Sequence, residues 1–253
     1  MIEVVGLNKS FSGKQVLTDI NAVFEAGKSS LIIGASGSGK TTLIKCIVGL
    51  HTPETGKILF DGRDFLSLNE KQKKEIRKEI GFLFQGAALF DSLNVEENVK
   101  FPLRMLSNMT EKEMQKRVDF CLERVNLPNV NHLMPSELSG GMKKRVGIAR
   151  AISMNPKYLF CDEPNSGLDP QTSVIIDRLI HEITQEYNIT TLVVTHDMNS
   201  VLEIGDHILF VYKGRIKWRG NSEEILRASD PHLNDFVYAS DFMKKIKDRL
   251  ASG

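Results

Sequence analysis

The sequence predicts an α/β fold built on a mostly parallel sheet with helices on both sides. Two observations support this prediction. Short apolar runs alternate along the chain with longer segments of helical periodicity, which is the order typical of parallel sheets. The run Lys157–Asp162 is almost purely apolar, and Thr190–His196 is similar, as expected for strands covered on both faces. With 253 residues and 41% hydrophobic content, the chain is long enough for a substantial core.

In the first third of the chain, short strands alternate with turn residues. The expected strands are Ile2–Leu7, Val16–Phe24, Ser29–Ile33 and Gly56–Gly62. The Lys-rich segment 69–79 is expected to be a helix with Asn69 as its N-cap and with a solvated charged face. It leads into another strand, Ile80–Gln85.

From about Gly86 the pattern becomes helical, and an insert in the α/β domain is expected there. Thr110 and Glu113 have the spacing of a capping box. The apolar positions that follow share one helical face, and they are Met114, Val118, Leu122 and Val125. The α/β pattern resumes at position 157.

The last part of the chain contains a further helix, a strand, a hairpin and a polar tail. Pro170 suits the first position of a helix that Asp169 caps. The segment His207–Gly220 predicts a hairpin that turns at Lys213 and Gly214. The last thirty or so residues are expected to form two short helices, the final one basic.

Composition excludes several classes of protein. The 33 Lys and Arg residues balance 32 Asp and Glu residues, so a polycationic surface for nucleic acid is not expected. Cys46, Cys121 and Cys161 are far apart in sequence, which favours buried thiols in a reducing compartment. No apolar run approaches the roughly 20 residues of a membrane span, and the start has no signal pattern. A soluble, cytoplasmic chain is therefore expected.

Residues 34–41, GASGSGKT, match G-x-x-x-x-G-K-[ST] between an apolar strand and a helix-compatible segment. Glycines let successive backbone N–H groups face phosphate oxygens, and the helix N-terminus adds partial positive charge. Lys40 would reach the terminal phosphates of ATP, and Thr41 would offer its hydroxyl to Mg²⁺. The expected ATP-binding residues are Gly34, Ala35, Ser36, Gly37, Ser38, Gly39, Lys40, Thr41 and Thr42.

Four polar residues at strand ends would complete this site. Asp162 can hold Mg²⁺ through water, and Glu163 can orient and deprotonate the water that attacks the γ-phosphate. His196 is either a turn residue or lies beside the same phosphates at the carboxyl edge of the sheet. Gln85 could contact Mg²⁺ or the attacking water. The expected catalytic residues are thus Glu163, His196 and Gln85, and the expected Mg²⁺ ligands are Thr41, Gln85 and Asp162.

The segment SELSGGMKKRVGIARA, residues 136–151, resembles a second phosphate site. Ser139, Gly140 and Gly141 open a basic helix and form an anion cradle without a lysine or a metal ligand. In the insert, this cradle would lie away from the phosphate-binding loop at residues 34–41, the P-loop, of its own chain. Its expected ligand is therefore the γ-phosphate bound to a second copy of the chain. This predicts a homodimer with two ATP molecules at its interface. The basic residues 143–145 are expected on a solvated face.

In chain order, these motifs resemble those of the ATP-binding cassette (ABC) ATPases over about residues 1–220. They are GASGSGKT, Gln85, LSGGM at 138–142, LFCDEP at 159–164, SGLDP at 166–170 and His196. The resemblance implies a P-loop NTPase (RecA-like) fold with an antiparallel N-terminal β part. It also implies an inserted helical subdomain at about 86–150 and a C-terminal extension at 221–253.

The same resemblance implies further site residues. Phe11 would stack on adenine with Val16 near it, although a Phe at this position could also be a small core or surface residue. Asp169 would cross the dimer interface and act in trans with the Ser139–Gly141 cradle.

Met142 stands where many cassettes have Gln. With the loop at 84–104, it resembles the Mla or MCE-associated ATPases, which power phospholipid movement between bacterial membranes. This implies MlaE-like permease subunits, MCE-domain and STAS-domain proteins as partners, and a peripheral location on the cytoplasmic side of the inner membrane. A small-solute importer ATPase, for amino acids for example, and a non-transport ABC ATPase are the alternatives.

Two further segments each allow two interpretations. An apolar cluster after position 85 forms either a surface groove for a helix of the permease or part of the insert's own core. It consists of Ala87, Ala88, Leu89, Phe90 and Leu93. The basic segment 241–250 is either a solvated terminal helix or a surface for an anionic membrane or partner.

Overall fold

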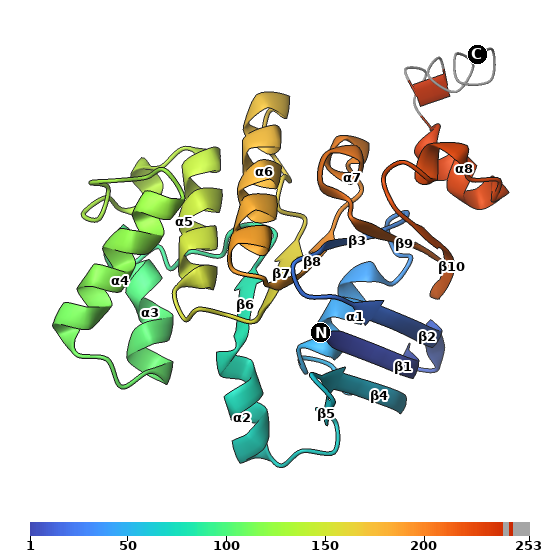
Figure 1. The fold of residues 1–253 in the computed structure, drawn as a ribbon, viewed down its shortest axis with the longest axis horizontal. Helices are drawn as coiled ribbons and strands as arrows, with labels where there is room; N and C mark the ends of the chain where they lie inside the picture. Colours follow the sequence, from blue (N-terminus) through green and yellow to red (C-terminus); the bar gives the residue numbers. More distant parts are fainter. Residues whose placement is uncertain (240–242, 245–253) are drawn as a thin grey trace.

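The computed structural model describes residues 1–239 and 243–244, which form two sheets and eight α-helices (Figure 1). The strands are β1 (Ile2–Phe11), β2 (Lys14–Phe24), β3 (Ser29–Ile33), β4 (Thr55–Phe60), β5 (Arg63–Asp64), β6 (Ile80–Leu83), β7 (Tyr158–Asp162), β8 (Thr190–Val194), β9 (His207–Tyr212) and β10 (Arg215–Gly220). The α-helices are α1 (Lys40–Ile47), α2 (Glu70–Lys78), α3 (Val95–Leu106), α4 (Glu111–Arg124), α5 (Gly140–Ile152), α6 (Pro170–Glu186), α7 (Met198–Ile204) and α8 (Pro231–Val237).

The six-stranded sheet has the order β10-β9-β3-β8-β7-β6, and the four-stranded sheet has the order β2-β1-β4-β5. In the larger sheet every pair is parallel except the hairpin of β9 and β10, whereas the smaller sheet is antiparallel. The predicted α/β fold, with a mostly parallel sheet and an antiparallel N-terminal part, is confirmed.

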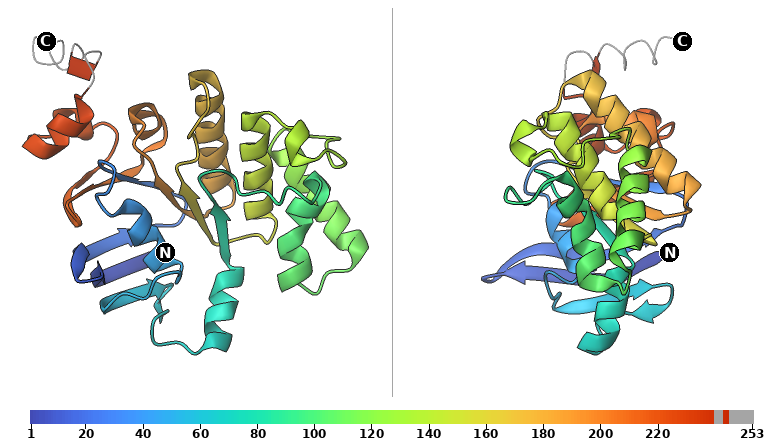
Figure 2. Two further views of the ribbon diagram at one scale, coloured as in Figure 1. Left: turned by 180° about the vertical axis from the view of Figure 1, so that it is seen from behind. Right: turned by 90° about the vertical axis from the view of Figure 1, so that its left-hand side faces the viewer.

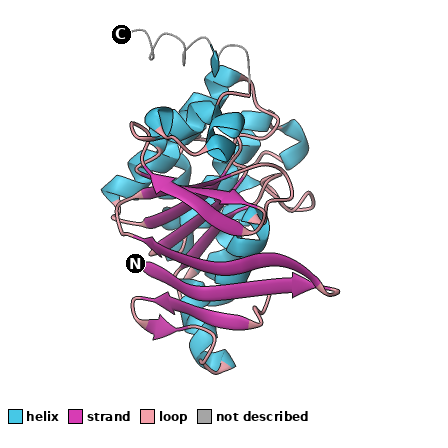
Figure 3. Ribbon diagram, turned by 90° about the vertical axis from the view of Figure 1, so that its right-hand side faces the viewer, coloured by secondary structure: helices cyan, strands magenta, loops and turns pink. Residues whose placement is uncertain are grey.

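Alternate residues of the larger sheet face two different hydrophobic cores, because successive side chains of a strand point to opposite faces. Ile32 and Phe160 pack with α1 and with the apolar face of the smaller sheet. Leu31 and Leu159 pack on the other side with residues of α3 to α7. Figure 3 shows the two sheets as separate layers. Since both faces are covered, the apolar runs of β3, β7 and β8 are fully accounted for.

The helical insert lies at one end of the molecule, where α3, α4 and α5 pack together (Figure 2). The capping box of α4 forms between Thr110 and Glu113, and the apolar face predicted for this helix is buried. Asn69 and Asp169 cap α2 and α6, as predicted. The insert shares its hydrophobic core with the larger sheet, so its orientation is tied to the strands.

The segment after β10 folds back onto the same core. Ile225, Leu233 and Val237 are buried there, the last two on the first predicted C-terminal helix, α8. The predicted basic helix at 241–250 lies outside the described residues except for 243–244. Within the part of the chain that the structure describes, no helix is both long and apolar enough to cross a membrane.

Candidate active site

The predicted site residues follow four neighbouring parallel strands and therefore meet at one edge of the larger sheet. β8 lies between β3 and β7, and β6 pairs with the far side of β7. The P-loop follows β3, His196 follows β8, Glu163 follows β7 and Gln85 follows β6. Because the carboxyl ends of parallel strands form a single edge, residues more than a hundred positions apart become neighbours.

The P-loop needs glycine at both of its ends. Gly34 has φ of +145°, and a Cβ there would lie 2.2 Å from the carbonyl oxygen of Val211. Gly39, the N-cap of α1, has φ of +111° and offers no side-chain cap to the first helical turn. The free N–H groups of that turn and the helix dipole are the features that bind phosphate.

Lys40 places its ammonium group inside this loop. Its Nζ donates hydrogen bonds to the carbonyl oxygens of Gly34, at 2.7 Å, and Ala35, at 3.2 Å. Burial lowers the pKa of Lys40, whereas the charges of Glu163 and Asp162 raise it. The hydroxyl of Ser38 is buried without a hydrogen-bond partner. A cation, an orphaned hydroxyl and free N–H groups form a donor set that suits a polyphosphate.

Thr41 and Asp162 place two oxygen ligands beside the loop. The Thr41 hydroxyl donates to a carboxylate oxygen of Asp162 at 3.4 Å. Burial raises the pKa of Asp162, and the charge of Glu163 raises it further. Among the described residues no cluster of three or more acidic, His or Cys side chains could enclose a metal. Such a sparse donor set fits Mg²⁺, which is usually held by one or two protein ligands, substrate phosphates and water.

Glu163 forms a contact with His196 across the ends of β7 and β8. The Nδ1 atom of His196 lies 3.0 Å from Oε1 and 2.8 Å from Oε2 of Glu163. Glu163 has φ of +49°, a left-handed conformation that is unfavourable for a residue with a side chain. Its backbone N–H donates to Val194 of β8 at 2.9 Å. The carboxylate is thus held against His196.

The remaining residues predicted for the nucleotide lie at the margin of the site. Phe11 is 41% exposed, and the centroid of its ring lies 5.1 Å from that of the His51 ring in a T-shaped arrangement. A Cβ on Gly39 would lie 3.1 Å from the carbonyl oxygen of Val16, so Val16 adjoins the P-loop. Gln85 is exposed, and its backbone oxygen, rather than its amide, accepts hydrogen bonds. Contacts of Phe11 with adenine and of the Gln85 amide with Mg²⁺ stay predictions.

The residues predicted to act in trans gather in a separate cavity of about 280 Å³ between the starts of α5 and α6. Ser139 caps α5, and Asp169 caps α6 by accepting the backbone N–H of Thr172 at 3.0 Å. Gly140 and Gly141 line the same cavity, whereas no P-loop residue does. The predicted cradle is therefore open and separate from the phosphate loop of its own chain.

Some residues of the apolar cluster after Gln85 lie in the hydrophobic core, and others lie at a surface groove. Ala87 is fully buried, and Leu89 packs against the main core. Ala88 and Phe90 instead line a surface cavity of about 370 Å³, and Leu93 lines neither it nor the core. This apolar groove lies between β6, α3 and α5, and the residues that line it include Phe82, Phe84, Ala88, Phe90, Phe101 and Pro102.

The prediction of a solvated basic face at 143–145 is wrong for Lys144, which is only 4% exposed. Its ammonium group points inward because α5 packs against the loops that carry Gln85 and Glu163. Within a run of basic residues, no sequence signal distinguishes this lysine. Its position on α5 relative to the sheet decides its burial.

Behind the site, a buried polar cluster joins the loop between β7 and α6 to the helix that follows His196. Asn165 donates to the hydroxyl of Ser200 at 3.0 Å. Burial raises the pKa of the nearby Asp177 to about 6, although hydrogen bonds from Ser200 and Asn165 lower it. One carboxylate oxygen of Asp177 is buried without a partner. This cluster was not foreseen, because its three residues are dispersed in sequence.

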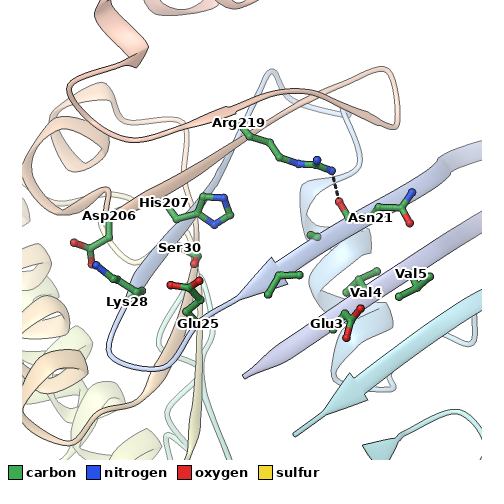
Figure 4. Close-up of a pocket in the computed structure, with 12 residues that line it drawn as sticks. Glu3, Val4, Val5, Asn21, Glu25, Lys28, Ser30, Asp206, His207 and Arg219 are labelled. Carbon is green, nitrogen blue, oxygen red and sulfur yellow. Dashed lines mark hydrogen bonds between the residues drawn. The ribbon is translucent and has the colours of Figure 1, made fainter. Parts of the chain in front are cut away.

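A further cavity lies outside this site. It has a volume of about 600 Å³ and lies at the opposite edge of the sheet, near the amino ends of β3 and β9 (Figure 4). Ser30 and His207 line it where the two strands pair, and Arg219 bonds to the backbone oxygen of Asn21 at its rim. Because the phosphate loop follows the other end of β3, this cavity cannot contact it.

Comparison with known proteins agrees with this geometry. The sequence profile of the ABC transporter family matches residues 17–166. "Intermembrane phospholipid transport system ATP-binding protein MlaF" of Haemophilus influenzae is 38% identical over 94% of this chain and 90% of its own length. "Methionine import ATP-binding protein MetN" of Clostridium acetobutylicum is 38% identical, with 95% and 75% covered. The Mycobacterium leprae "Probable ribonucleotide transport ATP-binding protein mkl" is also 38% identical, with 93% and 68% covered. The chain spans 66% of the corresponding Mycobacterium tuberculosis protein.

Solved structures point the same way. The dimeric post-hydrolysis state of the ATP-binding cassette MJ0796, bound to ADP and Pi, superposes with a TM-score of 0.80 at 31% identity, covering 88% of this chain and 99% of that one. The structure of cbiO1 from Clostridium perfringens gives 0.84 at 32% identity, covering 99% and 98%. Fold and site together define a P-loop ATPase. The chain belongs to the ABC transporter family, and it is an ATP-binding cassette of that family.

The buried carboxyl of Asp177 should make the stability of the fold depend on pH. Its pKa is about 6 in the folded chain against an ordinary 3.8, so between these values the folded state binds more protons than the unfolded state. The free energy of unfolding therefore falls as pH rises through this range. Asp177→Asn removes the penalty, and we expect it to gain up to about 3 kcal/mol at pH 8 but less at pH 5.

Urea denaturation at the two pH values measures this difference. Asp235→Asn, at an exposed position of α8, is the matched control and should change stability little at either pH. An equal effect of Asp177→Asn at pH 5 and pH 8 would show that the carboxyl does not titrate in this range.

Proposed function

We propose that this chain is the ATP-hydrolysing subunit of a transporter that drives a separate membrane permease, with phospholipids moving between bacterial membranes as cargo. The observation that carries the ATPase part is the single row of Lys40, Asp162, Glu163 and His196 at the carboxyl edge of the sheet. Met142 and the segment 84–104, together with the MlaF relative, support the cargo.

In this proposal, Lys40 and the first turn of α1 bind the ATP phosphates. Thr41 and Asp162 would hold Mg²⁺, with Gln85 as a further ligand, and the bound ion would supply positive charge to the phosphates. Glu163 takes a proton from the attacking water. His196 holds the carboxylate of Glu163 through the 2.8 Å contact and, being largely exposed itself, also reaches the γ-phosphate. Phe11 and Val16 bind the adenine side of the nucleotide.

Two copies complete the site in this proposal. Ser139, Gly140 and Gly141 of one copy meet the γ-phosphate on the P-loop of the other, and Asp169 crosses beside them. The open cavity at the starts of α5 and α6 supports this arrangement, as do its separation from the P-loop and the dimeric MJ0796 cassettes. Closure of the dimer would exclude water from both sites and so couple ATP binding to movement.

The permease is proposed to dock at the apolar groove. Phe84, Phe90 and Phe101 are between 37% and 43% exposed, and the ring centroids of the last two lie 4.7 Å apart. A contiguous exposed aromatic surface suits an apolar helix of a partner. In the proposal this partner is an MlaE-like permease, with MCE-domain and STAS-domain proteins in the same assembly. The chain would then be peripheral on the cytoplasmic side of the inner membrane.

A second cargo has support of its own, because the MetN relative is as similar in identity as the MlaF relative. Purification of the chain with its membrane partners, followed by mass spectrometry of bound small molecules, separates the two. Stoichiometric phospholipid with an MCE-domain partner is the expected result. An amino acid with a solute-binding protein would reject the phospholipid proposal in favour of small-solute import.

The role of Glu163 is tested by Glu163→Gln, which removes the proton acceptor but keeps size and hydrogen bonding. We expect steady-state ATP hydrolysis to fall about 10²- to 10⁴-fold, while ATP binding persists and the dimer accumulates. Glu123→Gln, at an exposed site on α4, is the control. Hydrolysis near the parental rate in Glu163→Gln would reject the assignment of the base.

The shared site is tested by Ser139→Arg, which places a long side chain in the cavity at the start of α5. We expect ATPase activity to be lost because the second copy can no longer approach the γ-phosphate. Binding of ATP to the monomer, measured by calorimetry, should not change, since Ser139 is not part of its own P-loop. Retention of parental ATPase activity would mean that the Ser139 region does not face nucleotide.

A further inference from the structure

Lys144 on α5 connects two loops of the active site. Its Nζ donates hydrogen bonds to the backbone oxygens of Gln85 and Glu163, the latter at 3.3 Å, and to the hydroxyl of Ser166 at 3.2 Å. Ser166 in turn donates to the oxygen of Gln85 at 3.1 Å. An ammonium group has three N–H donors, and all three are used here. One buried group thus ties the loop after β6 to the loop between β7 and α6, which carries both Glu163 and Ser166.

Burial of the Lys144 ammonium group costs free energy, because the charge is removed from water. Burial lowers the pKa of Lys144, while nearby Cys161, Glu163 and Asp162 raise it. Its hydrogen-bond partners are two carbonyls and one hydroxyl, and none is a carboxylate. An ammonium removed from water needs such bonds to be tolerated at all. An apolar side chain of similar length would fill the space without this cost. The feature that distinguishes a lysine at this position is therefore its set of hydrogen bonds to the two loops.

A second buried cation of the same helix binds the groove side of the Gln85 loop. Arg150 donates to the backbone oxygens of Ala87, at 2.6 Å, and Ala88, at 2.8 Å. Ala87, Ala88 and Glu163 all have positive φ, which is unfavourable for residues with side chains. The carbonyls of these three residues are bound by Lys144 or Arg150. Helix α5 therefore holds the apolar groove at Arg150 and Glu163 at Lys144.

We propose that Lys144 is a positioning residue that fixes the backbone of Glu163 and links it, through α5, to the apolar groove. The proposal rests on the role proposed above for Glu163. Lys144 does not touch nucleotide in this account, and it acts through the direction in which Glu163 points. A movement of α5 when a partner occupies the groove would thereby change the rate of hydrolysis.

The test compares Lys144→Met, which keeps length but removes all donors, with Lys144→Gln, which keeps an amide donor. We expect kcat for ATP hydrolysis to fall about 10- to 10²-fold in Lys144→Met and less in Lys144→Gln, with KM and ATP affinity unchanged. Lys143→Met is the matched control, because Lys143 is half-buried next to Lys144 in sequence and forms none of these bonds. Thermal unfolding of each variant separates this effect from loss of the fold.

The decisive measurement is a double-mutant cycle with Glu163→Gln. If Lys144 acts through Glu163, Lys144→Met should have little further effect on the residual rate of Glu163→Gln. Rate losses that multiply in the double variant would overturn the proposal, as would a parental kcat in Lys144→Met. Parental activity in Glu163→Gln alone is a different outcome, which rejects the base assignment itself.

Discussion

The parallel pairing of β3, β8, β7 and β6 is the constraint on which the rest of the structure depends. Each strand is short, and β3, β7 and β8 are covered on both faces, so their register is fixed by apolar side chains on two sides. The order of the strands differs from their order in the chain, with β8 inserted between β3 and β7. That order brings His196 beside Glu163 and Asp162 beside Thr41. A different order of the same strands would separate the groups that are proposed to act on phosphate.

Much of the fold could be predicted because its signals are local. The apolar runs of β3, β7 and β8, the caps at Asn69, Thr110 and Asp169, and the turn at Lys213 depend on residues near one another in sequence. The phosphate loop was equally predictable, because its motif is a short continuous run of residues. Its glycines permit local backbone conformations that other residues rarely adopt, such as the φ of +145° at Gly34. His196 depended on one further assumption, that its strand is adjacent to β3, and the pairing of β3 with β8 confirms it.

The parts that escaped prediction depend on packing between distant segments. Lys144 belongs to a run of basic residues that favours solvent, yet the position of α5 against the loops after β6 and β7 buries it. The division of the apolar cluster between Ala87, in the core, and Phe90, at the groove, likewise depends on where α3 and α5 lie. The cluster around Asp177 unites three separate segments. In each case the burial of a side chain depends on contacts between distant segments, which sequence spacing does not reveal.

The central claim is that an active site needs the P-loop of one copy and the Ser139–Gly141 cradle of another. It is tested most directly by mixing two inactive variants, Lys40→Ala and Ser139→Arg. In a mixed dimer, the intact P-loop of the Ser139→Arg copy meets the intact cradle of the Lys40→Ala copy. We expect mixing to restore up to about a quarter of the parental ATPase activity, because half of randomly paired dimers hold one complete site out of two. No gain of activity on mixing, with mixed dimers verified by native mass spectrometry, would contradict it.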